Sequence, residues 1–231
     1  MMKSSDLIVV PNVAIAGAEL FSKIAKQSVR DRGRFIVNLS GGSTPLRMYE
    51  SLLSQGDLPW EATWVTWGDE RFVPPESEES NYGLAKRLLL EKVPIPSNQI
   101  LSWPWDPKLA APKTAQIFED LLKNTFGNPP IFDLTFLGLG EDAHTASLFP
   151  GSEAIYAQGL TSAVKTANLG WRLTMTPRVL SSSLTVAFLV SGKSKLTALR
   201  NTISGEGDLD SFPARAITAR NDQLVLTDQV L

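Results

Sequence analysis

The chain has one histidine, His144, and the residues around it are of types that support acid–base chemistry. The apolar run Leu134–Leu137 predicts a short buried strand, and Gly138 and Gly140 then permit a tight turn. Side chains that follow the carboxyl end of a strand in an open α/β sheet lie where such folds bind ligands. An imidazole there, with Asp142 two residues before it, can accept a proton. The alternative is an ordinary capped turn in which the histidine packs against a neighbour.

A second stretch indicates an anion site. The run Phe35–Leu39 predicts a central strand, and the loop after it combines glycines, hydroxyl side chains and a proline suited to a helix start, reading Ser40-Gly41-Gly42-Ser43-Thr44-Pro45. The N–H groups at a helix N-terminus favour a phosphate group. On its own, the loop is explained equally well as a capped turn without a ligand.

Two further strand ends carry charged side chains. A predicted strand at 62–67 leads into Gly68-Asp69-Glu70-Arg71, and one at 184–190 leads into Ser191-Gly192-Lys193-Ser194-Lys195. The lysines stand at a predicted helix start, where they could meet an anion. Charge after a strand is most often simply solvated, so neither segment identifies a site by itself.

The elements that must position these loops alternate between strand and helix along the chain. Apolar residues recur at helical spacing over Val13–Val29 and Thr114–Phe126, whereas 160–164 and 171–175 alternate as paired strands do. This alternation predicts an α/β fold of three layers, α/β/α, with a mostly parallel sheet covered on both faces. No linker marks two domains, so we expect a single domain over residues 1–231.

The composition limits the possible functions. Lys and Arg number 22, Asp and Glu number 24 and the net charge is −2, so no global field draws the chain to nucleic acid or to an anionic membrane. The lack of cysteine excludes disulfides, thiolate nucleophiles and Cys-ligated metals, and one histidine excludes a multi-histidine metal site. The N-terminal apolar run is too short for a signal peptide or a membrane span, which predicts a cytoplasmic protein.

Taken together, four segments resemble the 6-phosphogluconolactonase family. They are the loop at 39–45, Trp67-Gly68-Asp69-Glu70-Arg71, Ser80-Asn81-Tyr82 and the run Gly138–Gly151, which contains His-Thr-Ala-Ser-Leu-Phe-Pro-Gly. That family is grouped with glucosamine-6-phosphate isomerases in a Rossmann-like fold shared with ribose-5-phosphate isomerase. The resemblance implies hydrolysis of 6-phospho-D-glucono-1,5-lactone to 6-phosphogluconate, the second step of the oxidative pentose phosphate pathway, without a cofactor or metal.

Carried over by position, the resemblance assigns the 6-phosphate of the substrate to the loop Gly41-Gly42-Ser43-Thr44, helped by Arg172 and Lys195. Lys193 is an alternative to Lys195, and the family spacing favours Lys195. Because three separate segments would then meet one ligand type, phosphate binding is favoured over an empty turn.

The same resemblance makes His144 the general base that activates water, with Asp69 or Asp142 orienting its imidazole. Arg71 would bind substrate hydroxyls or the developing negative charge, and an ion pair with a neighbouring carboxylate is the structural alternative. The family usually has glycine where this chain has Ala143. A positive φ at that alanine would cost on the order of 1 kcal/mol.

The expected partner is a small sugar phosphate lactone, with no nucleic acid and no membrane, and the expected state is a monomer or weak homodimer. Two other functions stay open. One is deamination of glucosamine 6-phosphate, although the sequence has no obvious lid segment of the deaminase type. The other is a non-catalytic sugar-phosphate sensor, although no nucleic-acid module accompanies the chain.

Overall fold

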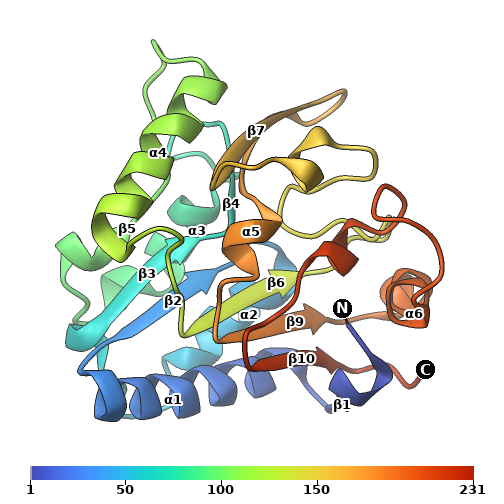
Figure 1. Ribbon diagram of the computed structural model, residues 1–231. Helices are drawn as coiled ribbons and strands as arrows, with labels where there is room; N and C mark the ends of the chain where they lie inside the picture. Colours follow the sequence, from blue (N-terminus) through green and yellow to red (C-terminus); the bar gives the residue numbers. More distant parts are fainter. Residues whose placement is uncertain (1) are drawn as a thin grey trace.

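The computed structural model describes residues 2–231, and its centre is a sheet of seven parallel strands (Figure 1). The strands are β1 (Leu7–Val9), β2 (Phe35–Leu39), β3 (Thr63–Trp67), β5 (Ile100–Leu101), β6 (Leu134–Gly138), β9 (Thr185–Val190) and β10 (Asp222–Thr227). Their order across the sheet is β1-β10-β9-β6-β2-β3-β5. The predicted α/β fold with a mostly parallel sheet is confirmed.

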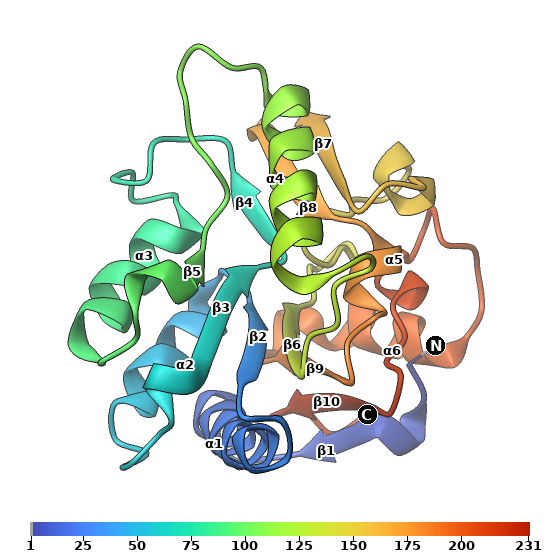
Figure 2. The same cartoon turned by 60° about the vertical axis from the view of Figure 1, so that its left-hand side comes forward.

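Layers cover both faces of this sheet. Helices α1 (Val13–Arg32) and α2 (Ser43–Leu52) pack together on one face, with α3 (Asn81–Leu88) beside α2. The opposite face carries α4 (Ala111–Phe126), α5 (Pro177–Leu180) and a small antiparallel sheet (Figure 2). The strands of this sheet are β4 (Asp69–Arg71), β8 (Gly170–Met175) and β7 (Thr161–Thr166), in that order. Strand β4 was not predicted, because its three residues are charged and only Gly68 separates them from β3.

Burial explains why the central strands form. Every residue of β2 and of β9 is buried, as expected for strands covered on both faces. Phe21 of α1 meets Phe35 of β2 edge to face, with ring centroids 5.1 Å apart. A fully buried phenylalanine contributes about 1.5–3 kcal/mol of hydrophobic free energy, so such contacts fix the helix on the sheet. Gly33, at φ 72°, ends α1 in the left-handed conformation.

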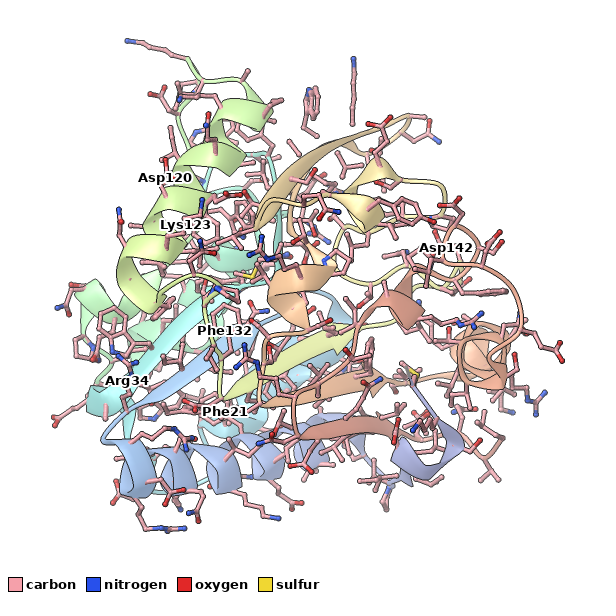
Figure 3. All side chains as sticks on the ribbon, in the orientation of Figure 1. Phe21, Arg34, Asp120, Lys123, Phe132 and Asp142 are labelled. Atoms are coloured by element: carbon pink, nitrogen blue, oxygen red, sulfur yellow. The ribbon has the colours of Figure 1, made fainter. Side chains whose placement is uncertain are left out.

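Parallel pairing brings several loops to one edge of the molecule. In Figure 3, Arg34, directly before β2, and Asp142, after β6, lie at opposite ends of the sheet. The loops after β9, β6, β2 and β3 therefore lie side by side at the carboxyl edge. Along the chain, β3 is followed by β4, and β9 is followed by helix α6 (Leu196–Ser204). This is the edge at which open α/β sheets bind ligands. Among residues 2–231, no helix is both long and apolar enough to cross a bilayer.

Asp133 joins the amino edge of the sheet to helix α1. Its buried carboxylate accepts hydrogen bonds from the backbone N–H of Ile36 and from the guanidinium of Arg32, each at 2.7 Å. It thereby ties the start of β6 to β2 and to the end of α1. Removing this carboxylate would leave the buried N–H of Ile36 without its acceptor.

We predict that Asp133→Ala lowers the free energy of unfolding by about 2–3 kcal/mol, the cost of losing a hydrogen bond to a charged group and stranding a buried donor. Urea denaturation followed by circular dichroism measures this change. Asp31→Ala is the matched control, because the Asp31–Arg32 pair is exposed and 3.9 Å apart. The control should shift stability by no more than about 0.5 kcal/mol, and equal shifts for both variants would contradict the prediction.

Candidate active site

A cavity of about 230 Å³ lies over the carboxyl edge of the sheet. Its walls come from the loops after β2, β6 and β9 and from β4 and the start of α3. Ligand pockets usually measure about 300–1,000 Å³, so this one suits a small metabolite. Of the residues predicted to act in binding or catalysis, it brings together Gly41, Gly42, Ser43, Thr44, Asp69, Arg71, His144 and Lys195.

His144 is held by a short loop that closes on itself. Asp142 Oδ1 accepts two hydrogen bonds from this histidine, one from the imidazole Nδ1 at 2.5 Å and one from the backbone N–H at 3.2 Å. The backbone N–H of Gly140 donates to the carbonyl of His144 at 2.8 Å, and that of Ala143 donates to the carbonyl of Gly140 at 3.1 Å. Ring and backbone are therefore positioned by the same few residues.

The contact with Asp142 determines how the imidazole can act. A carboxylate at Nδ1 places the proton of the neutral ring on that nitrogen and leaves the Nε2 lone pair to accept a proton. Partial burial opposes ionisation of Asp142, but its hydrogen bonds with His144 outweigh this effect and hold the pKa of the carboxyl below its usual value. The His144 side chain is 33% exposed, so the ring is accessible to solvent.

Two alanines near His144 adopt left-handed backbone conformations. Ala143 has φ 64° and Ala146 has φ 48°, a region that costs an L-residue about 1–2 kcal/mol. Ala143 is buried, and its carbonyl accepts a hydrogen bond from the N–H of Ala214 at 3.2 Å. The position therefore does use a positive φ, and surrounding contacts hold the alanine there. Strain of this kind persists where neighbouring structure over-determines the backbone.

Asp69 lines the cavity, but no hydrogen bond joins it to His144 in the described chain. Its Oδ2 accepts a hydrogen bond from Ser147 Oγ at 2.8 Å, and its backbone carbonyl accepts one from Asn81 Nδ2 at 2.9 Å. Of the two carboxylates considered for orienting the imidazole, Asp142 is the one in contact with it. Ser147 and Asn81 were not predicted as functional residues, although both stand within the segments that carry the family resemblance.

Glu70 is buried and connects the two ends of a surface loop. Its carboxylate accepts hydrogen bonds from the backbone N–H groups of Arg71, Asn81 and Tyr82 and from Ser80 Oγ, at 2.7–3.1 Å. Burial raises the pKa of Glu70, and the three backbone hydrogen bonds partly offset that rise. The residue thus holds the start of α3 against β4.

The two arginines predicted to bind the substrate, Arg71 and Arg172, lie on neighbouring strands. Arg71 of β4 is directly opposite Arg172 of β8. Arg71 reaches the cavity wall and donates from Nη1 to the carbonyl of Glu79 at 2.5 Å, rather than pairing with Glu70 or Asp69. Arg172 is only 8% exposed and does not line the cavity. Its burial, together with the charge of Arg71, lowers the pKa of the guanidinium. Arg172 therefore lies beside Arg71, at the edge of the site, without lining its cavity.

Two loops of similar backbone geometry flank the loop of His144. Gly42 precedes α2 with φ 96° and ψ 166°, and Gly192 precedes a 3-10 turn, Lys193–Lys195, with φ 95° and ψ 149°. Their strands, β2 and β9, lie on either side of β6. Helix starts present N–H groups without intrahelical acceptors, and Lys195 adds a cation to the cavity wall. Lys193 is exposed and lies outside that wall.

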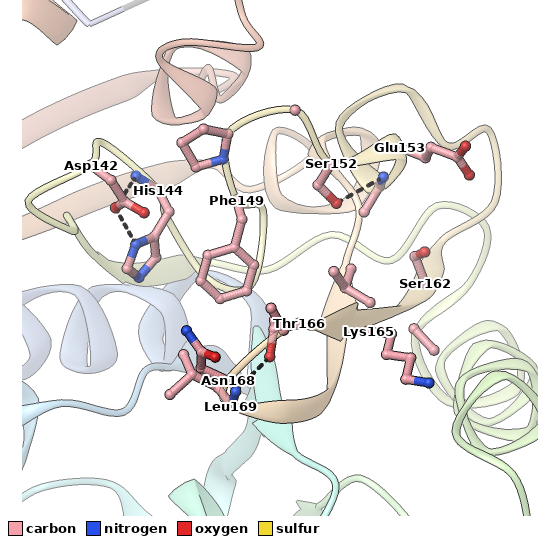
Figure 4. A pocket seen from close by; sticks show the side chains of 16 residues that line it. Asp142, His144, Phe149, Ser152, Glu153, Ser162, Lys165, Thr166, Asn168 and Leu169 are labelled. Atoms are coloured by element: carbon pink, nitrogen blue, oxygen red, sulfur yellow. Dashed lines mark hydrogen bonds and ion pairs between the residues drawn. The ribbon is translucent and has the colours of Figure 1, made fainter.

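A larger groove of about 760 Å³ borders the site on another side (Figure 4). Asp142 and His144 lie at one of its edges, and Lys165, Asn168 and Leu169 come from β7 and the turn after it. The ring of Phe149 lies 4.8 Å from that of His144, so one face of the imidazole meets an apolar neighbour. His144 lines both the groove and the smaller cavity.

Comparison with known proteins identifies the family. A profile of the family described as Glucosamine-6-phosphate isomerases/6-phosphogluconolactonase matches residues 11–226. The chain belongs to this family. A protein named 6-phosphogluconolactonase from Synechocystis sp. is 38% identical over 210 residues, which cover 88% of this chain and 85% of that protein. One of the same name from Nostoc sp. is 35% identical over 204 residues, covering 87% and 85%.

Solved structures confirm the fold within this family. The crystal structure of 6-phosphogluconolactonase from Thermotoga maritima matches with a TM-score of 0.85 at 26% identity, covering 96% of this chain and 98% of that one. A monomeric glucosamine-6-phosphate deaminase matches with a TM-score of 0.84 at 19% identity, covering 99% and 98%. The same fold thus occurs in a protein named for a different reaction, so function must be argued from the site.

We predict that Gly140→Ala disables the site while the fold persists. A Cβ at this position would lie 2.1 Å from His144 Nδ1 and 2.5 Å from Asp142 Oδ1, so the imidazole and its carboxylate must shift away from their present positions. We expect kcat for lactone hydrolysis to fall about 10²-fold or more, the usual contribution of a positioned general base. Near-normal kcat would show that this geometry is not needed, and circular dichroism and thermal unfolding serve as the check on folding.

Proposed function

We propose that the protein hydrolyses 6-phospho-D-glucono-1,5-lactone to 6-phosphogluconate, the second step of the oxidative pentose phosphate pathway. The observation that carries this proposal is one small cavity lined by His144, by the glycine loop before α2 and by Lys195, with Asp142 bound to the imidazole of His144. Relatives named 6-phosphogluconolactonase, at 35% and 38% identity, support the same reaction.

The 6-phosphate binds at the loop Gly41-Gly42-Ser43-Thr44, opposite Lys195. Gly42 has a positive φ, and a Cβ there would meet no atom within 4 Å, so the loop leaves room for a ligand to approach the backbone. The N–H groups at the start of α2 and the ammonium of Lys195 then face the phosphate oxygens. Arg172 and Lys193 do not line the cavity, so this proposal assigns the phosphate contacts to the loop and to Lys195 alone.

His144 supplies the proton transfers. A water molecule attacks C1 of the lactone while Nε2 accepts its proton, and a tetrahedral oxyanion forms at C1. The bond between C1 and the ring oxygen then breaks, and the imidazolium returns the proton to that oxygen, which becomes the 5-hydroxyl group. Asp142 keeps the ring in the required tautomer and stabilises its charged form.

Arg71 and Asp69 complete the site. The Arg71 guanidinium lies at the cavity wall, and we place it against the developing oxyanion or a neighbouring hydroxyl group. The Asp69 carboxylate, held by Ser147, accepts hydrogen bonds from sugar hydroxyl groups or from the attacking water. No step in this scheme uses a metal or cofactor, and their absence from the reaction is part of the proposal.

We expect His144→Ala to lower kcat for the phosphorylated lactone by about 10²–10⁴-fold with little change in KM, because a general base acts mainly in the transition state. The assay must subtract spontaneous opening of the lactone. Retained turnover in a folded variant would remove His144 from the mechanism.

Release of ammonia from glucosamine 6-phosphate by the unmodified protein, without lactone hydrolysis, would favour deamination instead. Binding of 6-phosphogluconate without either activity would favour a sensor.

We expect Lys195→Ala to raise KM for the phosphorylated lactone about 10-fold or more, the value of a lost hydrogen bond between charged groups, while kcat changes little. Lys193→Ala is the matched control, because it removes the same charge two residues away on an exposed side chain. Steady-state kinetics of both variants measure the difference. A larger effect in the control would reverse our assignment of the two lysines.

The cellular setting is also a proposal. A chain without cysteine, with a small polar substrate and without a long apolar helix in residues 2–231, suits the cytoplasm. We propose a monomer or weak homodimer that binds neither nucleic acid nor membrane. Size-exclusion chromatography with light scattering measures the oligomeric state.

A further inference from the structure

The loop that carries Lys195 is anchored by a carboxylate from the end of the chain. Asp228, directly after β10, accepts a hydrogen bond from Ser191 Oγ at 2.6 Å through Oδ2 and one from the N–H of Gly192 at 2.9 Å through Oδ1. The N–H of Lys195 in turn donates to the carbonyl of Gly192 at 3.1 Å. The backbone of the lysine is therefore linked to Asp228 through one residue.

The corresponding loop before α2 is anchored differently. There the buried hydroxyl of Tyr49, on α2 itself, donates to the carbonyl of Ser40 at 2.6 Å. Each of the two loops that flank the His144 loop thus has its own anchor, and the anchor of the Lys195 loop is a charged residue directly after β10, the strand next to β9. Gly192, at φ 95°, has no side chain to pack at this turn, so the hydrogen bond to its N–H restricts an otherwise permissive backbone.

The carboxylate of Asp228 lies outside the cavity of the candidate site. The carboxylate lines another cavity, of about 540 Å³, together with Thr44 and Arg47, and does not line the cavity of the candidate site. Although partial burial opposes ionisation, hydrogen bonds from Ser191, Gln229 and Gly192 outweigh it and lower the pKa of Asp228, which keeps the anchor ionised at neutral pH. Ser191 lines the candidate site, but its proton is donated to Asp228, so it offers an acceptor there rather than a donor.

We propose that Asp228 is a positioning residue for the phosphate group of the substrate. It acts through Ser191 and Gly192, holding the turn that places the Lys195 ammonium at the cavity. This role rests on the proposed function, because it requires an anionic group opposite that lysine. It predicts that Asp228 affects binding of the phosphorylated end of the substrate and not the chemistry at C1.

Kinetics of Asp228→Ala with two substrates test the role. KM for 6-phospho-D-glucono-1,5-lactone should rise about tenfold, as for loss of a hydrogen bond to a charged group, while kcat stays within about twofold. The value of kcat/KM for unphosphorylated glucono-1,5-lactone should not change, because that substrate has no phosphate to hold. Asp228→Asn keeps an acceptor for one of the two donors of the Lys195 loop, Ser191 Oγ and the N–H of Gly192, and should give an intermediate KM. Asp222→Ala, at the exposed start of β10, is the control and should match the unmodified protein.

Calorimetric titration with 6-phosphogluconate keeps this inference separate from the proposed reaction. If the unmodified protein binds 6-phosphogluconate but does not hydrolyse the lactone, the proposed reaction fails, and a weaker Kd in Asp228→Ala still supports the positioning role. An unchanged KM and Kd, equal losses for both lactones, or a fall in kcat alone would each overturn it. So would absence of binding to the unmodified protein. If Asp228→Ala does not fold, the same measurements on Asp228→Asn decide.

Discussion

The chemistry of the site depends on the hydrogen bonds between His144 and Asp142, and these depend on a backbone without a side chain at residue 140. The imidazole lies in the space that a Cβ on Gly140 would occupy. The same glycine donates its N–H to the carbonyl of His144, so the residue that makes room for the ring also fixes the backbone from which the ring extends. Base, carboxylate and turn therefore form one local unit, set at the end of β6.

Sheet order places this unit among the other parts of the site. Strand β6 lies between β9 and β2, whose loops both turn through a glycine of positive φ into a helical segment. His144, on the loop after β6, thus has on each side a loop whose geometry is suited to binding an anion. The long parallel strands set this arrangement, and it needs no contact between the flanking loops themselves.

Most of this arrangement could be predicted from the sequence because each component follows its own buried strand. Apolar runs located the strands, and the residues after them included Gly42, Asp69, His144 and Lys195, which do line one cavity. What the sequence did not reveal depended on pairing between distant segments. Periodicity does not reveal that β4 pairs with β8, so the burial of Arg172 opposite Arg71 was not foreseen.

Local geometry limited the prediction as well. Sequence left Asp69 and Asp142 as equal candidates for the partner of His144, because the first reaches the site through tertiary structure and the second through a tight turn. The turn provides the contact, and it does so with Ala143 in a left-handed conformation that residue type alone argued against. The single domain over the whole chain, like the oligomeric state, stays a prediction.

The buried carboxylate of Glu70 has a consequence for how this surface can vary. It accepts hydrogen bonds from the backbone at both ends of the loop 72–79, and Arg71 also binds the carbonyl of Glu79, so the two ends of that loop are joined through these contacts. Lengthening a loop whose ends are already fixed costs little, since closure entropy grows only slowly with length. The exposed residues Glu76 and Glu78 lie between these contacts, so the chain can accept inserted residues between them, including a reporter or an affinity tag, while the Arg71–Glu79 contact and the cavity wall stay in place.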